Sequence, residues 1–400
     1  MSSKAQIRWL IIGLITFGSM LQVVSADIFD DLEIHGFATQ GFVKTSANSF
    51  FGDSEKGSFE FRELGVNSTF EPTPNIRVSG QILSRRAGEM YSGSPRVDFA
   101  LADFTIRSTA EDSFGFVVGR IKNPLGFFNE TRDVAFARPS MFLPQVIYFD
   151  NARNLIMSSD GAGVRMELFD DAANINLYLA AGKPIVDENV EYAFLGTSYS
   201  GEFEPDGISF VGRLLLETSD DRLRTSFSIA STSLEFERRK LDPIGSGSFD
   251  LVYWIASLQY VIENWTITTE YMREPLSWQG FDSSMFGGTN VAAEGYYLQS
   301  SWQAREDLEL MIRYEEGFAD RRDRAGKNLH NQTFGQVSKQ SRYSKIATVG
   351  IRWDLSRRFM LRAEYQKHHG TFILSNRENL TSAELEPDWD MFAISASYRF

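Results

Sequence analysis

The sequence divides into sixteen β-prone segments whose connections alternate between short and long, and this alternation limits the possible folds most strongly. The short connections are polar turns, such as residues 219–221 and 263–264. Transmembrane β-barrels join their strands by short turns on one side and long loops on the other. A soluble β-sandwich does not require its connections to alternate between short and long. The long connections are residues 47–58, 87–95, 122–159, 183–206, 235–247, 274–292, 318–341 and 371–388.

Side chains within the segments alternate between apolar and polar. In the segment 358–370, Phe359 and Leu361 share one face, and Arg362 and Glu364 share the other. Such alternation is typical of strands with lipid on one side and a wet lumen on the other. An open sheet edge is not tolerated in lipid, so the strands must close on themselves. The sequence therefore predicts an all-β, transmembrane, antiparallel barrel of sixteen strands, with short periplasmic turns and long external loops.

Aromatic residues cluster beside the short turns, where a membrane interface is expected to hold a ring of aromatic side chains. The alternative is coincidence, because strands of any kind are enriched in aromatic residues. The predicted ring consists of Phe70, Phe114, Phe169, Trp265, Trp302, Trp353, Phe359 and Phe400.

Residues 1–26 have the pattern of a secretory signal peptide. Lys4 and Arg8 precede an apolar run from residue 9 to residue 24, and small residues precede Asp27. The alternative is a single transmembrane anchor. Cleavage would leave residues 27–400 as the barrel. This exported chain has no cysteine, so it has no disulfide framework.

The connection 122–159 is unusual in length and content. Loops longer than about 12–15 residues are usually functional or disordered. Disorder is not expected here, because the stretch is rich in Phe, Ile, Leu, Met and Tyr. Pro124, Pro139 and Pro144 each disfavour helix at the preceding residue. We therefore predict an ordered, locally basic loop that packs against other parts of the protein.

The last segment carries a resemblance to a known family. Phe392, Ile394 and Ala396 alternate toward Tyr398 and a terminal Phe400, which is similar to the signature by which outer-membrane proteins are recognised for insertion. With the signal peptide and the sixteen segments, residues 27–400 resemble the Gram-negative porins. The core of the connection 122–159 is also similar to a porin group related to the phosphate-selective porins.

This resemblance implies an outer-membrane location in a Gram-negative bacterium and assembly as a homotrimer. It also implies contacts with outer-membrane lipid, lipopolysaccharide and the barrel-assembly machinery. In the porin superfamily the third external loop folds into the barrel and narrows the pore. Residues 122–159 form the third long connection of this chain, so they are the expected constriction loop.

Charged residues of this loop and of the lumen wall are the candidates for pore constriction and selectivity. Charged rings set the sign of a pore's selectivity, and low-dielectric walls focus their field. Lumen-facing acids such as Glu63, Glu270 and Glu364 would offset the arginines. The alternative is that the loop arginines pair with acids of the same loop, including Asp150, and only hold it in place. The candidates are Arg77, Arg120, Lys122, Glu130, Arg132, Asp133, Arg138, Arg153, Arg313, Arg352 and Arg362.

The function predicted from these features is a porin for passive diffusion of small hydrophilic solutes, with a mild preference for anions. An outer-membrane hydrolase acting on lipid or protein is one alternative, and an adhesin or receptor is another. The sequence has no G-x-S-x-G, H-E-x-x-H or P-loop motif. His368 and His369 are adjacent on a strand and so face opposite ways. We expect no enzyme activity, no cofactor or metal, and no nucleic-acid partner.

Overall fold

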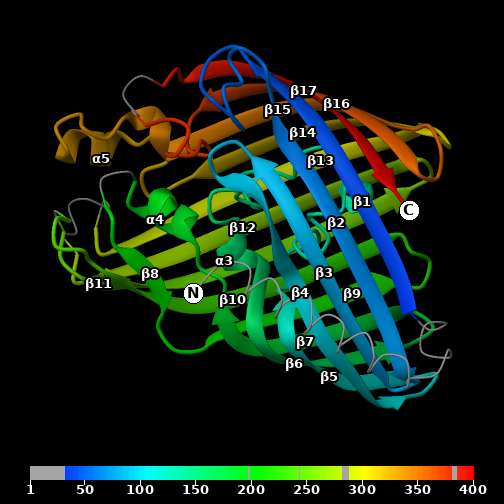
Figure 1. The fold of residues 1–400 in the computed structure, drawn as a ribbon. Helices are drawn as coiled ribbons and strands as arrows, with labels where there is room; N and C mark the ends of the chain where they lie inside the picture. The colour runs from blue at the N-terminus through cyan, green and yellow to red at the C-terminus, as the bar shows by residue number, and fades with distance from the viewer. Residues whose placement is uncertain (1–31, 197–198, 243, 282–287, 381–384) are drawn as a thin grey trace, which may run out of the picture.

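The computed structural model describes residues 32–196, 199–242, 244–281, 288–380 and 385–400. It forms one antiparallel sheet that closes on itself (Figure 1). β1 (Leu32–Thr45) pairs with β2 (Ser58–Thr73) on one side and with β17 (Asp388–Arg399) on the other, which closes the barrel. The predicted signal peptide, residues 1–26, lies outside the described residues. None of the described helices is long and apolar enough to cross a membrane.

Neighbouring strands pair in chain order around the barrel. β8 and β9 both pair with β10, one along each half of it, so together they make one interrupted strand. The predicted count of sixteen is therefore confirmed. The remaining strands are β3 (Ile76–Ala87), β4 (Tyr91–Ser108), β5 (Asp112–Lys122), β6 (Ser158–Phe169), β7 (Ala173–Pro184), β8 (Glu202–Pro205), β9 (Ser209–Thr218), β10 (Leu223–Glu237), β11 (Gly247–Ile262), β12 (Trp265–Gln279), β13 (Asn290–Arg305), β14 (Leu308–Phe318), β15 (Tyr343–Asp354) and β16 (Phe359–Gly370).

The connections alternate in length as predicted, with one exception. The prediction of a long loop over residues 87–95 is wrong, because β4 begins at Tyr91 and only residues 88–90 connect it to β3. Gly93 has a φ of +89°, and the register of β3 on β4 shifts twice near this end. Such bulges let a strand continue through polar residues and glycines whose sequence pattern is typical of a loop.

The outer surface is apolar and carries the predicted aromatic ring. Seven members of the ring are exposed at the short-turn end, and Phe70 is half-buried. Trp265 and Trp302 stack across β12 and β13 with ring centroids 5.7 Å apart. A closed barrel with this outer surface is suited to lie in a membrane.

The largest apolar cluster lies inside the barrel rather than between two layers. It joins residues of the connection 123–157, such as Phe142 and Val146, to lumen-facing wall residues such as Phe61 and Tyr297. We call residues 123–157 the inner loop. It contains a short 3-10 helix, η2 (Ala135–Ala137), and α3 (Arg153–Met157). Two further helices, α4 (Glu188–Phe194) and α5 (Lys327–Gln332), belong to other long connections.

Candidate functional site

The inner loop is fixed to the lumen wall along much of the barrel circumference. The Gly126 N–H donates a hydrogen bond to Ser228 Oγ of β10 at 2.8 Å. Tyr148 Oη donates to Glu270 Oε2 of β12 at 2.7 Å. Further along, Ser140 Oγ accepts a hydrogen bond from the Arg313 guanidinium of β14 at 2.8 Å. Backbone and side-chain polar groups of the loop thus bind polar side chains that point inward from the strands.

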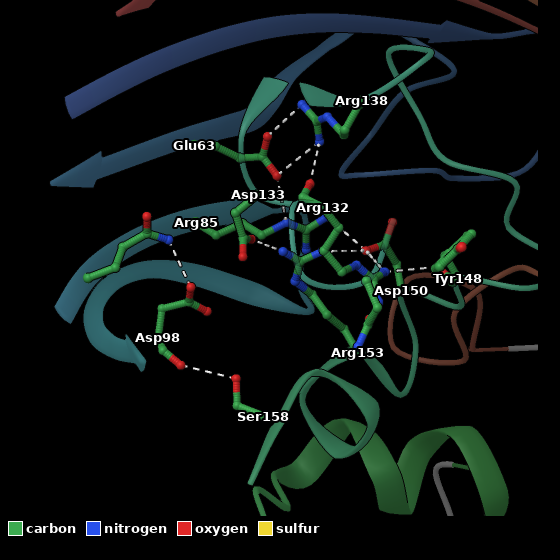
Figure 2. A network of polar contacts seen from close by, with 12 residues as sticks. Glu63, Arg85, Asp98, Arg132, Asp133, Arg138, Tyr148, Asp150, Arg153 and Ser158 are labelled. Atoms are coloured by element: carbon green, nitrogen blue, oxygen red, sulfur yellow. Dashed lines mark hydrogen bonds and ion pairs between the residues drawn. The ribbon is translucent and has the colours of Figure 1, made fainter. Parts of the chain in front are cut away.

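The other side of the inner loop forms a cluster of opposed charges with β2, β3 and β4. Figure 2 shows that arginines and carboxylates of the loop converge with those of the wall. Arg138 binds Glu63 at 2.9 Å, and Arg85 binds Asp150 at 3.0 Å. Lys122 lies 2.7 Å from Asp98 and 2.9 Å from Asp133. We call this set the charge cluster; its members are Glu63, Arg85, Asp98, Lys122, Arg132, Asp133, Arg138, Asp150 and Arg153.

Asp150 is the most shared carboxylate of the charge cluster. Its Oδ1 lies 3.0 Å from Arg85, 3.4 Å from Arg132 and 3.6 Å from Arg153. Arg153 also pairs with Asp133. The cluster holds five basic and four acidic groups, so its net charge is +1.

Burial shapes the electrostatics of these groups. The side chains of Arg132 and Arg153 are 2% exposed, and Asp133 is fully buried. Burial lowers the pKa of Arg153 well below its usual range, and the nearby charges of Arg132 and Arg85 lower it further. Burial, together with the Glu270 carboxylate, raises the pKa of Tyr148 well above its usual range, so its hydroxyl remains a donor.

The arginines offer more donors than the surrounding protein accepts. Arg85 Nη1 and the Nε atoms of Arg132, Arg138 and Arg153 are buried without a hydrogen-bond partner among the described residues. A cavity of about 10 Å³ lies between these side chains. Such a space holds about one water-sized species. The charge cluster is therefore poised to hold water or a small anion at its centre.

Five of the predicted site residues lie together in the structure, and the others lie elsewhere. Lys122, Arg132, Asp133, Arg138 and Arg153 all belong to the charge cluster. Arg132 and Arg153 of the loop do pair with loop acids, as the structural alternative proposed. Arg138 instead pairs with the wall acid Glu63, which that alternative did not include.

The wall arginines lie on the lumen side, as predicted. Arg352 binds Asp354 at 3.0 Å and donates to the Phe136 carbonyl. Arg362 donates to the Ser140 carbonyl at 2.6 Å.

Three predicted residues lie away from the cluster. Glu130 is at the opposite edge of the inner loop and pairs with Arg213 of β9. Arg77 is 60% exposed near the short-turn end and pairs with Glu71. Arg120 pairs with Asp160 at 2.8 Å.

Arg120 departs from the expected lumen position. It lies directly opposite Ala100 of β4 and on the same face of β5 as the exposed Val118, so it is on the outer surface. The sequence prediction grouped it with the loop although the strand continues to Lys122.

The prediction missed Arg85 and Asp98. The alternation of β3 contained the signal for Arg85, because Arg85 lies eight positions after the lumen-facing Arg77 and so faces the same side of the strand. Asp98 falls in the stretch where the bulged start of β4 obscured the pattern.

The adjacent histidines point apart, as predicted. His368 is buried inside the barrel and stacks on Trp389 with ring centroids 3.7 Å apart. His369 is on the outer side and binds Asp388 at 2.8 Å. They therefore do not share one site.

Comparison with known proteins establishes the fold. No protein-family model and no curated protein matches the sequence. The outer membrane channel DcaP of Acinetobacter baumannii superposes with a TM-score of 0.57 at 12% identity, over 92% of this chain and 97% of that one. The anion-selective porin from Comamonas acidovorans gives a TM-score of 0.53 at 11% identity, over 92% and 99%. OmpF of Salmonella typhi gives 0.55 at 14% identity, over 92% and 97%. The predicted barrel of an outer-membrane porin is thus confirmed at the level of the fold.

Proposed function

We propose that this chain, which has the closed sixteen-strand fold of outer-membrane porins, is a channel of the Gram-negative outer membrane. It passes small hydrophilic solutes by passive diffusion and mildly prefers anions. The observation that carries the proposal is the inner loop, which brings a cluster of buried charges into the interior of the barrel. Proteins with the same fold include a named channel and a named anion-selective porin.

The distribution of exposed charges favours a water-filled path on the side of β6 to β10. There the lumen-facing side chains of Arg165, Arg213 and Arg224 are 19%, 12% and 32% exposed. On the opposite side, Arg313 and Glu315 are 0% and 1% exposed because the inner loop covers them. Solutes would therefore pass along this wall, beside the ion pair that joins Glu130 at the loop edge to Arg213.

The anion preference rests on the partly exposed guanidinium groups of Arg165, Arg213 and Arg224 along this path. The buried charge cluster, with its net charge of +1, adds to the positive field in the lumen. Arginine has a planar fork that matches phosphate or carboxylate. Acids near the path, such as Glu130, Glu167 and Glu217, oppose the arginines and keep the preference mild.

Reversal potentials under a potassium chloride gradient, measured on the refolded protein in a planar bilayer, test the proposal. We expect stable conductance and a potential that favours chloride. Arg224→Gln removes a half-exposed lumen charge and should shift the potential toward potassium. Arg120→Gln is the matched control, because that ion pair is also half-exposed but lies on the outer surface.

Three results would contradict the proposal: a silent but correctly folded barrel, a potassium preference of the unaltered protein, or equal shifts for both variants.

Assembly as a homotrimer belongs to the same proposal. OmpT of Vibrio cholerae, which superposes with a TM-score of 0.54 at 12% identity, has been solved in a trimer form. Closure in steps of three during the bilayer measurement would support a trimer. We also propose that the terminal Tyr398 and Phe400 direct insertion by the barrel-assembly machinery, and that lipid and lipopolysaccharide contact the outer surface.

A further inference from the structure

A second cavity lies in the interior at the long-loop end of the barrel, separate from the charge cluster. Its volume is about 370 Å³, which falls in the range of small-molecule sites. Phe149, Asn151 and Ala152 of the inner loop and the end of α4 form one part of its wall. The last lumen-facing residues of β12 and β13, with the connections after β14 and β16, form the rest.

Aromatic and aliphatic side chains make up most of this wall. Phe149 and Phe372 meet edge to face with ring centroids 5.5 Å apart. Phe194 and Trp278 meet in the same way at 6.1 Å, and Leu276 belongs to the same apolar cluster. A wall of this kind favours a ligand with an apolar or aromatic body.

Two charged side chains line the same cavity, Glu274 of β12 and Arg342 at the end of a 3-10 helix, η4 (Lys339–Arg342), just before β15. Neither side chain forms an ion pair or hydrogen bond with any residue in the described part of the chain, and they do not pair with each other. Asp320 and Asp323 line an adjoining cavity of about 200 Å³ beside Arg342, beyond ion-pair distance. An unpaired charge beside apolar surface is costly unless a ligand supplies the opposite charge.

We propose that this cavity binds a small zwitterion with an apolar or aromatic body, such as an aromatic amino acid. The ammonium group of the ligand binds the Glu274 carboxylate, and its carboxylate binds the Arg342 guanidinium. The aromatic walls hold the body and add a cation–π attraction for the ammonium group. This site goes beyond the proposed channel function, since binding here does not require that the barrel conducts.

Isothermal titration calorimetry of the full barrel in detergent tests the proposal with four probes. L-phenylalanine has both charges and the ring, phenethylamine lacks the carboxylate, 3-phenylpropionate lacks the ammonium group, and glycine lacks the ring. We expect phenylalanine to bind at least about tenfold more tightly than each of the others, because a lost charged hydrogen bond or a lost ring contact costs about that much.

Variants assign the two ends of the ligand. Glu274→Gln should weaken phenylalanine binding about tenfold and leave 3-phenylpropionate unchanged. Arg342→Gln should weaken phenylalanine and leave phenethylamine unchanged. Glu235→Gln, an exposed carboxylate of β10 outside the cavity, is the control and should change nothing. Circular dichroism of the β-sheet checks that each variant is folded.

The proposal is overturned if phenylalanine binds no more tightly than glycine, or if Glu274→Gln binds it as the parent does. Equal affinity for phenethylamine and phenylalanine would overturn the assignment of Arg342. Because these are binding measurements, a failure here leaves the bilayer result for the channel unaffected.

Discussion

Replacing Asp150 by asparagine should destabilise the barrel more than any other single change in the charge cluster. One carboxylate oxygen of Asp150 serves Arg85, Arg132 and Arg153 at 3.0, 3.4 and 3.6 Å. The substitution keeps the size of the side chain and removes its charge. Three buried guanidinium groups then lose a shared counter-charge, and the net charge of the cluster rises from +1 to +2.

The expected loss follows from burial. Asp150 and its three partners are all 9% exposed or less, so bulk water has little access to the guanidinium groups that lose the carboxylate. Removing one partner of a buried ion pair costs about 3–5 kcal/mol. Glu130→Gln is the matched control, because the Glu130 carboxylate pairs with Arg213 but is 41% exposed. Exposed pairs contribute about 0–1 kcal/mol.

Guanidinium unfolding in lipid vesicles, followed by tryptophan fluorescence, measures both changes. We expect the free energy of unfolding to fall by about 3–5 kcal/mol for Asp150→Asn and by at most about 1 kcal/mol for Glu130→Gln. A loss for Asp150→Asn no larger than that of the control would show that water or ions compensate the cluster, and would refute the reasoning from burial.

Three further predictions concern the loop ends, the inner loop and the terminus. Burial raises the pKa of Glu378 to about 7, so its contribution to stability should be full below about pH 4.5 and lost as the pH rises through about 7. The midpoint temperature of thermal unfolding should therefore decrease as the pH rises from 5 to 8. In Glu378→Gln this decrease should be smaller. Gly126 has a φ of +61°, and an added Cβ would lie 2.7 Å from Glu270 Oε1. Gly126→Ala should therefore lower the free energy of unfolding by more than about 1 kcal/mol. It should also make single-channel currents noisier. Phe400→Ala removes a ring that packs over Gly36, so less folded barrel should reach the outer membrane than with Phe59→Ala, which removes another exposed aromatic ring (68% against 56% exposed).

Much of the fold could be read from the sequence because its signals are local. A strand alternates every second residue, so Arg362 and Glu364 could be assigned to the lumen and Phe359 to the outside without any knowledge of neighbouring strands. The aromatic ring was predictable for the same reason, since each member adjoins a short turn. Where local geometry was irregular, at the bulged start of β4, the prediction of a loop was wrong.

The candidate site was predictable only in part. The sequence marked the connection 122–159 as ordered and locally basic, and five of the predicted site residues do meet. Their partners could not be identified, because Glu63, Arg85 and Asp98 come from three different strands and the loop could pack against any part of the wall. Arg120 was misplaced because it was grouped with the loop, although it lies six positions after the outward-facing Phe114 in the same strand and so takes the outer face by alternation.

The sequence by itself determined the strand number, the order of short and long connections except the one between β3 and β4, and which side chains of the regular strands face lipid or lumen. These properties depend on residues close together in the chain. Only the tertiary structure decided that Asp150 is shared by three arginines and that Glu274 and Arg342 line one cavity. Those arrangements depend on where a closed barrel and its inner loop bring distant segments together, and the energy that selects them comes from contacts that exist only after the barrel has closed.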